Sequence, residues 1–194
     1  MSDSTFSEKH ALALIDQTIK SVRQKLGQNG FIFLLWGWLI LAGNLLSYAS
    51  IYFNFQNYIG YIWAVIGLGG GLISFLYYAK REKNKGPSSQ IEKYFTYVWS
   101  GVGLGAIVLY AYMIWANEFM LITPFVLTLA GIATFISGRI LKVPALVLGG
   151  ISFWVGTALA LCFQTEVQFL IGAGCMVTGY LIPGFVLKAK SKKG

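Results

Sequence analysis

Charge is missing from long stretches of this sequence, and its absence argues against a soluble domain. Between residues 31 and 79 there is no Lys, Arg, Asp or Glu, and charged residues make up only 11% of the 194 residues. Soluble domains have about 25% charged residues. The apolar runs are about 20 residues long, which is the length of helix that crosses a bilayer. The sequence therefore predicts an all-α polytopic membrane protein with the lipid bilayer as its main partner.

Histidine and cysteine are also scarce, which argues against most metal and thiol chemistry. The single histidine, His10, precedes the first apolar run, and Cys162 and Cys175 lie in apolar runs without metal-ligand spacing. An intramembrane serine protease needs a histidine at membrane depth, and a zinc enzyme needs clustered ligands. We therefore expect no catalytic residues, no metal and no cofactor.

The basic residues that are present predict the topology. All 15 Lys and Arg fall in the N-terminal segment, a central loop at 80–93, the Arg139–Lys142 segment and the C-terminal tail. Basic loops stay on the cytoplasmic side of a membrane. The predicted outer turns carry only Glu118 and Glu166. Both termini are therefore predicted to be cytoplasmic, in a multi-pass protein of the plasma (bacterial inner) membrane. The same rule explains the net charge of +8, so we expect no nucleic-acid partner.

The predicted organisation has three parts. A cytoplasmic amphipathic helical arm at 1–30 precedes a six-span membrane domain at 31–187, and a basic cytoplasmic tail follows at 188–194. Short turns join the spans into a bundle of three hairpins, with spans at about 31–52, 58–78, 94–115, 120–138, 144–163 and 167–187.

The arm has one apolar face. Its apolar residues recur at spacings of three and four, which places them on one side of a helix: Leu12, Ile15, Ile19, Val22 and Leu26. One interpretation is a helix that packs on the headgroup layer or on the protein's own bundle. The other is a face that binds a cytoplasmic protein partner, or a second copy, through residues 8–26.

Small residues recur at helical spacing within the spans. The set is Gly60, Gly67, Gly71, Ser74, Gly101, Gly105, Gly131, Gly149, Gly156, Gly172 and Gly179, together with the buried polar candidate Asn44 in the first span. Close backbone approach at small residues drives helix association in lipid. These residues therefore predict either tight helix packing or a narrow polar path.

The ends of three spans look alike, which suggests an old repeat. Residues Ile136–Lys142 match Ile182–Lys188, and Ile73 and Ser74 precede Lys80 in a similar way. Around Gly131–Lys142 and 148–161, the glycine-punctuated pattern resembles small bacterial six-span proteins built from paired-helix repeats, including an acid-resistance membrane protein family. The resemblance implies a stress-linked membrane protein without a defined catalytic site, and we carry over no functional residue.

Two functions follow from these patterns. The first is a non-catalytic membrane component, acting as a regulator, scaffold or stress accessory through its cytoplasmic face. The alternative is a passive channel or small-solute transporter that uses the Gly/Ser/Thr helix faces. An enzyme ranks third because the spans lack acid–base groups.

Overall fold

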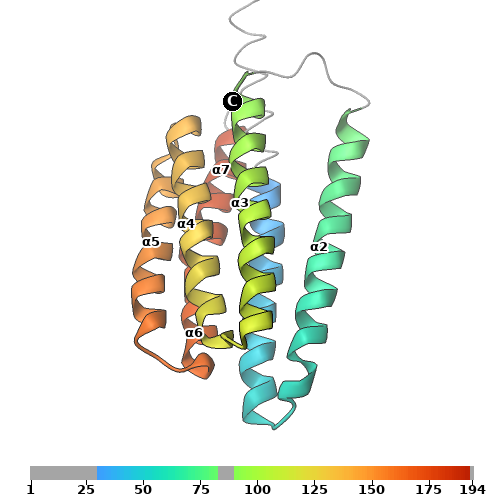
Figure 1. The fold of residues 1–194 in the computed structure, drawn as a ribbon. Helices are drawn as coiled ribbons and strands as arrows, with labels where there is room; N and C mark the ends of the chain where they lie inside the picture. Colours follow the sequence, from blue (N-terminus) through green and yellow to red (C-terminus); the bar gives the residue numbers. More distant parts are fainter. Residues whose placement is uncertain (1–29, 83–89, 193–194) are drawn as a thin grey trace, which may run out of the picture.

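The computed structural model describes residues 30–82 and 90–192 (Figure 1). The apolar face predicted at residues 8–26 lies outside the described residues. The first helix spans Gly30–Tyr52. It is followed by the 3₁₀ turn η1 (Gln56–Tyr58), α2 (Ile59–Glu82), α3 (Gln90–Ala116), the 3₁₀ turn η2 (Phe119–Leu121), α4 (Ile122–Leu141), α5 (Pro144–Leu161), α6 (Thr165–Met176), the π-helical segment η3 (Val177–Leu181) and α7 (Ile182–Lys192).

The described residues confirm an all-helical chain with six helices long and apolar enough to cross a membrane. These are Gly30–Tyr52, Gln56–Lys80, Lys93–Ala116, Phe119–Leu141, Pro144–Leu161 and Thr165–Lys190. The last of them runs through α6, η3 and α7. Lipid offers no hydrogen-bond partner to the backbone, so a helix, which satisfies its own N–H and C=O groups, is the form that these sequences can adopt there.

The two ends of the bundle differ in chemistry. The end with Lys80, Lys93, Lys142 and Lys188, here called the basic end, lies at the top of Figure 1. The end with η1, η2 and the α5–α6 connection, here called the turn end, lies at the bottom.

The centre of the bundle lies between the first helix and the sixth span. The sixth span is the most buried, with 56% of its most apolar window inside the protein. Tyr180, in η3, packs its ring against Phe33 of the first helix at 5.4 Å and against Phe153 of α5 at 5.1 Å. Trp99 of α3 reaches the same cluster, 5.9 Å from Phe33. These aromatic rings join four of the six spans.

The π-helical segment explains why the sixth span can contact several neighbours. Pro183, just beyond η3, has no N–H to donate to the carbonyl one turn earlier, and a local change of helix type is a common response. The widened turn leaves Gly179, Tyr180 and Leu181 all buried, although they are consecutive. Leu181 lies against Gly37 of the first helix, and Gly179 lies against Phe153. The segment therefore faces the first helix and α5 at once.

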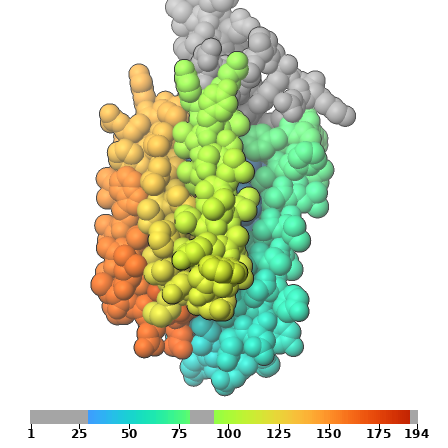
Figure 2. Space-filling model, viewed as in Figure 1, coloured from blue at the N-terminus to red at the C-terminus, as the bar shows by residue number. Residues whose placement is uncertain are grey.

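In contrast, α2 and α3 lie at the edge of the bundle. Only 6% of the most apolar window is buried in each of these spans, against 33% in the first, fourth and fifth. In Figure 1, α2 stands beside the first helix with its opposite side uncovered, and Figure 2 shows α3 on the open face beside α4. By contrast, α4 and α5 pack closely along their length. Only Lys142 and Val143 separate the end of α4 from Pro144, which begins α5.

Candidate functional site

The small residues of the last three spans lie in close contact with neighbouring helices. A Cβ at Gly131 would stand 2.6 Å from Nε1 of Trp154, and one at Gly149 would stand 2.9 Å from the carbonyl oxygen of Gly179. A Cβ at Gly156 would collide with Sγ of Cys175. Glycine is therefore required at these positions by the approach of a neighbouring helix, because no other residue leaves the space free.

The glycines that the sequence singled out in the second and third spans lie in open surroundings instead. Gly70 of α2, which the sequence did not single out, lies against Leu39 and Trp36 of the first helix. Nothing stands within 4 Å of where a Cβ would be at Gly60, Gly67, Gly71, Gly101 and Gly105. Among the described residues, these five glycines therefore bring no two helices together. The predicted small-residue faces fall into two groups, one filled by neighbours and one uncovered.

Asn44 belongs to the filled group. Its side chain is 5% exposed, its Nδ2 donates to the carbonyl of Ile40 at 2.8 Å, and its Oδ1 faces Gly172 of α6. A Cβ at Gly172 would stand 2.6 Å from that oxygen. The glycine thus makes room for the amide, and the two residues together set the distance between the first helix and the sixth span.

Several buried polar residues are missing from the sequence-based set. Ser47, Thr134, Ser137 and Gln168 are all at most 2% exposed. Nε2 of Gln168 donates to the carbonyls of Ala160 and Phe163, both at 3.0 Å, and so caps the end of α5. Single Ser, Thr and Gln residues in apolar runs show no periodic signal, so the sequence could not separate them from lipid-facing ones.

A repeated pair of hydrogen bonds was also missed. Trp36 Nε1 donates to Ser74 Oγ at 3.2 Å, and Trp99 Nε1 donates to Ser137 Oγ at 3.1 Å. In both pairs the serine lies 38 residues after the tryptophan. Each bond links a helix to the next one along the chain, near the basic end. Pro183, which the span-end likeness aligned with Ser137, instead packs its ring against Gly149.

The turns that follow Trp36 and Trp99 also share one geometry. Asn54 and Asn117 both have left-handed backbones, with φ of 61° and 60°. Phe55 N–H bonds to Ser50 O at 2.6 Å, and Glu118 N–H bonds to Met113 O at 2.9 Å. The 3₁₀ turns η1 and η2 then follow at matching positions.

Residues 30–80 and 93–143 therefore form two copies of one structural unit. The differences 99 minus 36, 117 minus 54 and 137 minus 74 all equal 63, so a single offset aligns tryptophan, turn asparagine and serine. A self-comparison of the sequence at that offset would have found them. Because both copies run from the basic end and back, they are parallel repeats.

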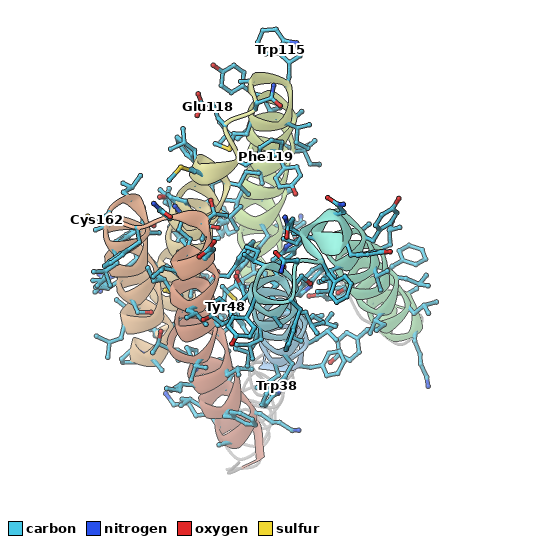
Figure 3. The ribbon with its side chains drawn as sticks, turned by 90° about the horizontal axis from the view of Figure 1, so that it is seen from below. Trp38, Tyr48, Trp115, Glu118, Phe119 and Cys162 are labelled. Carbon is cyan, nitrogen blue, oxygen red and sulfur yellow. The ribbon has the colours of Figure 1, made fainter. Side chains whose placement is uncertain are left out.

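The α3–α4 unit has a groove on its surface. It encloses about 430 Å³ and is apolar throughout, lined by Ala106, Ile107, Tyr110, Ala111, Ile114 and Val126. Figure 3, viewed from the turn end, shows Trp115, Glu118 and Phe119 around the α3–α4 turn. The groove offers van der Waals contact and no polar group to orient a substrate.

Acid–base groups are not brought together in the described part of the chain. There, no three residues of the His, Cys, Asp or Glu types come close enough to hold a metal ion. The thiols of Cys162 and Cys175 are both free, the first exposed near the turn end and the second buried against Gly156 (Figure 3 shows Cys162). Asn44 and Ser47 of the first helix and Gln168 of α6 are buried polar side chains, and Asn44 faces Gly172 of α6.

Comparison with protein-family models, curated proteins and solved structures gave no match for this chain.

Proposed function

We propose that this protein is a non-catalytic, multi-pass component of the plasma (bacterial inner) membrane. It serves as a regulator, scaffold or stress accessory that acts through its cytoplasmic face. Its six spans form three hairpins with both termini in the cytoplasm, so the basic end faces inward. The stress-linked role is the one that the resemblance to the paired-helix proteins implies.

The observation that supports this proposal most directly is the filling of the core. Glycines of α4, α5 and α6 are contacted by side chains of neighbouring helices, for example Gly156 by Cys175 and Gly172 by Asn44. A transport path along these faces needs space that the neighbouring side chains occupy. The features that we expect a soluble partner to use are then exposed basic residues of the basic end, such as Arg139 and Lys142, together with the predicted arm.

The topology is tested by labelling single cysteines with a membrane-impermeant maleimide. In a background with Cys162 and Cys175 replaced by alanine, Lys142→Cys should react only after the inner side is opened. Asn117→Cys should react in intact cells. Reaction of Lys142→Cys in intact cells would contradict the orientation.

The partner role is tested by affinity purification of the full chain from native membranes. Ile15→Asp with Ile19→Asp should remove a stoichiometric cytoplasmic partner and reproduce the loss-of-function phenotype. Gln17→Asp with Gln24→Asp is the matched control, because it adds the same charge on the opposite face of the predicted helix. Equal complexes and phenotypes in both variants would refute the proposal.

A passive path for small solutes remains the second candidate, favoured by the buried polar residues Asn44, Ser47 and Gln168. Flux in proteoliposomes that is abolished by Asn44→Leu would support it. Gly67→Leu is informative as well, because Gly67 has open space around it within one chain. Loss of flux in that variant would require a path formed between copies.

A further inference from the structure

The first helix and the sixth span each carry buried polar side chains toward the turn end, namely Asn44 and Ser47 on one and Gln168 on the other. Asn44 faces Gly172, and farther toward the basic end Gly37 faces Tyr180 and Leu181. The two helices are therefore antiparallel and in register along this contact. Ser47 lies three residues after Asn44. Because the helices are antiparallel, this register places Ser47 level with a position about three residues before Gly172, one residue from Gln168. Figure 3, viewed along the bundle, shows the neighbouring Tyr48 on the side of the first helix that faces the sixth span.

Two of these side chains have a polar atom without a partner. Ser47 is 0% exposed and Gln168 is 2% exposed. Within the described residues, Ser47 Oγ and Gln168 Oε1 have no hydrogen-bond partner. A buried polar group without a partner is destabilising, and lipid around the bundle supplies no substitute. Two such atoms at one interface indicate a third group between them.

Gln168 Oε1 is an acceptor without a partner, and Asn44 likewise turns its amide oxygen toward α6. Gln168 directs its Nε2 to two carbonyls and Asn44 directs its Nδ2 to Ile40 O, so each amide leaves its oxygen at the interface. A carbonyl oxygen cannot donate, and Ser47 supplies only one hydroxyl proton. The interface therefore favours a ligand that presents positive charge density to oxygen.

The surroundings agree with that preference. Glu118 and Glu166 are the charged residues that the described part of the chain places at the turn end, and the described Lys and Arg lie toward the basic end. Residues 44–47 lie within two turns of Tyr52, where the first helix ends, so the interface is close to this acidic surface.

We propose that Asn44, Ser47 and Gln168 form a buried acceptor site that holds one small ligand, either a water molecule or a monovalent cation. This inference goes beyond the proposed function, which concerns the opposite end of the bundle. With a ligand bound, Ser47 Oγ stabilises the fold, so its removal should lower the Tm. An unpaired Oγ destabilises the fold, so its removal would raise the Tm.

The test is thermal unfolding of the purified full chain in nanodiscs. Ser47→Ala should lower the Tm by about 2–4 °C, the shift expected for loss of one buried polar contact in a chain of this size. Ser50→Ala is the matched control, because its hydroxyl lies one turn away and bonds to Leu46 O at 2.8 Å. It should change the Tm little. A higher or unchanged Tm for Ser47→Ala would overturn the proposal.

Salt identity then separates the two ligands. The Tm of the wild type and of Ser47→Ala is measured in NaCl, KCl and choline chloride of equal ionic strength. If NaCl or KCl raises the Tm of the wild type above its value in choline chloride and leaves that of Ser47→Ala unchanged, the ligand is a cation. Equal Tm values in the three salts, with Ser47→Ala still destabilised, identify water. A structure at a resolution that shows ordered water provides the independent readout. Density between Ser47 and Gln168 supports the site, and a direct hydrogen bond between them without such density refutes it.

Discussion

The second and fourth spans occupy the same place in two copies of one unit, yet their surroundings differ. Both carry a serine that accepts a tryptophan N–H, and both follow a turn with a left-handed asparagine. In α4, Gly131 and Gly138 contact α5 closely, whereas the equivalent residues of α2, Leu68 and Phe75, are 77% and 68% exposed. Local sequence therefore sets the helix and the turn, and the presence of a neighbour decides which face is buried.

The largest expected effect comes from moving a residue of α2 into α4. Gly138→Phe introduces the side chain that α2 carries at the equivalent position, Phe75. A Cβ alone at residue 138 would stand 2.6 Å from the backbone nitrogen of Val147. Overpacking of this kind costs about 1–3 kcal/mol or more, and backbone atoms cannot turn aside. We expect a large loss of folded monodisperse protein in size-exclusion chromatography after heating. Gly67→Leu in α2, with nothing within 4 Å, is the control and should behave like wild type.

The second largest effect is expected at the two equivalent tryptophans, Trp36 and Trp99, whose replacement should cost different amounts of stability. Trp99 contacts the rings of Phe33, Phe95 and Tyr180, in addition to its hydrogen bond. Trp99→Ala should therefore destabilise the bundle by about 3 kcal/mol, as for large-to-small changes in a packed core. Trp36→Ala, which removes a partly buried ring that contacts Gly70 and Ser74 of the edge helix α2 and the hydrophobic core, should cost less. Thermal denaturation in one detergent measures both, and equal losses would show that the units contribute equally.

The turn asparagines should instead respond alike. Asn54→Ala and Asn117→Ala each place a less tolerant residue in the left-handed region, at a cost of about 1 kcal/mol. Asn54→Gly and Asn117→Gly should restore wild-type stability, because glycine adopts this conformation without a steric penalty. A marked inequality between the two alanine variants would mean that the turns are not equivalent.

The smallest effect is expected for the serine acceptors. Ser74→Ala should cost about 0.6 kcal/mol, the average for a side-chain hydrogen bond between membrane helices. Ser137→Ala should cost more, because Ser137 is fully buried and also donates to Ala133 O at 2.6 Å. A double-mutant cycle of Trp99→Phe with Ser137→Ala isolates the bond itself.

Some parts of the candidate site were accessible from sequence and others were not. Asn44 stood out because an amide in an apolar run is costly unless it finds a partner, and the structure gives it Ile40 and Gly172. The glycines of α2 and α3 show the same spacing as those of α5 and α6. That spacing indicates which residues share a face, and it carries no information on whether another helix lies against that face.

By itself, the sequence determined that the chain is helical and has six segments suited to lipid. Hydropathy and helix length depend on composition along one segment, and the bilayer imposes both independently of the fold. Only the tertiary structure decided that the sixth span is central, that α2 and α3 lie at the edge, and that Asn44 faces Gly172 while Ser47 and Gln168 are buried. Lipid-facing and helix-facing surfaces are equally apolar, so close packing and paired polar atoms distinguish them, and these exist only once the helices are assembled.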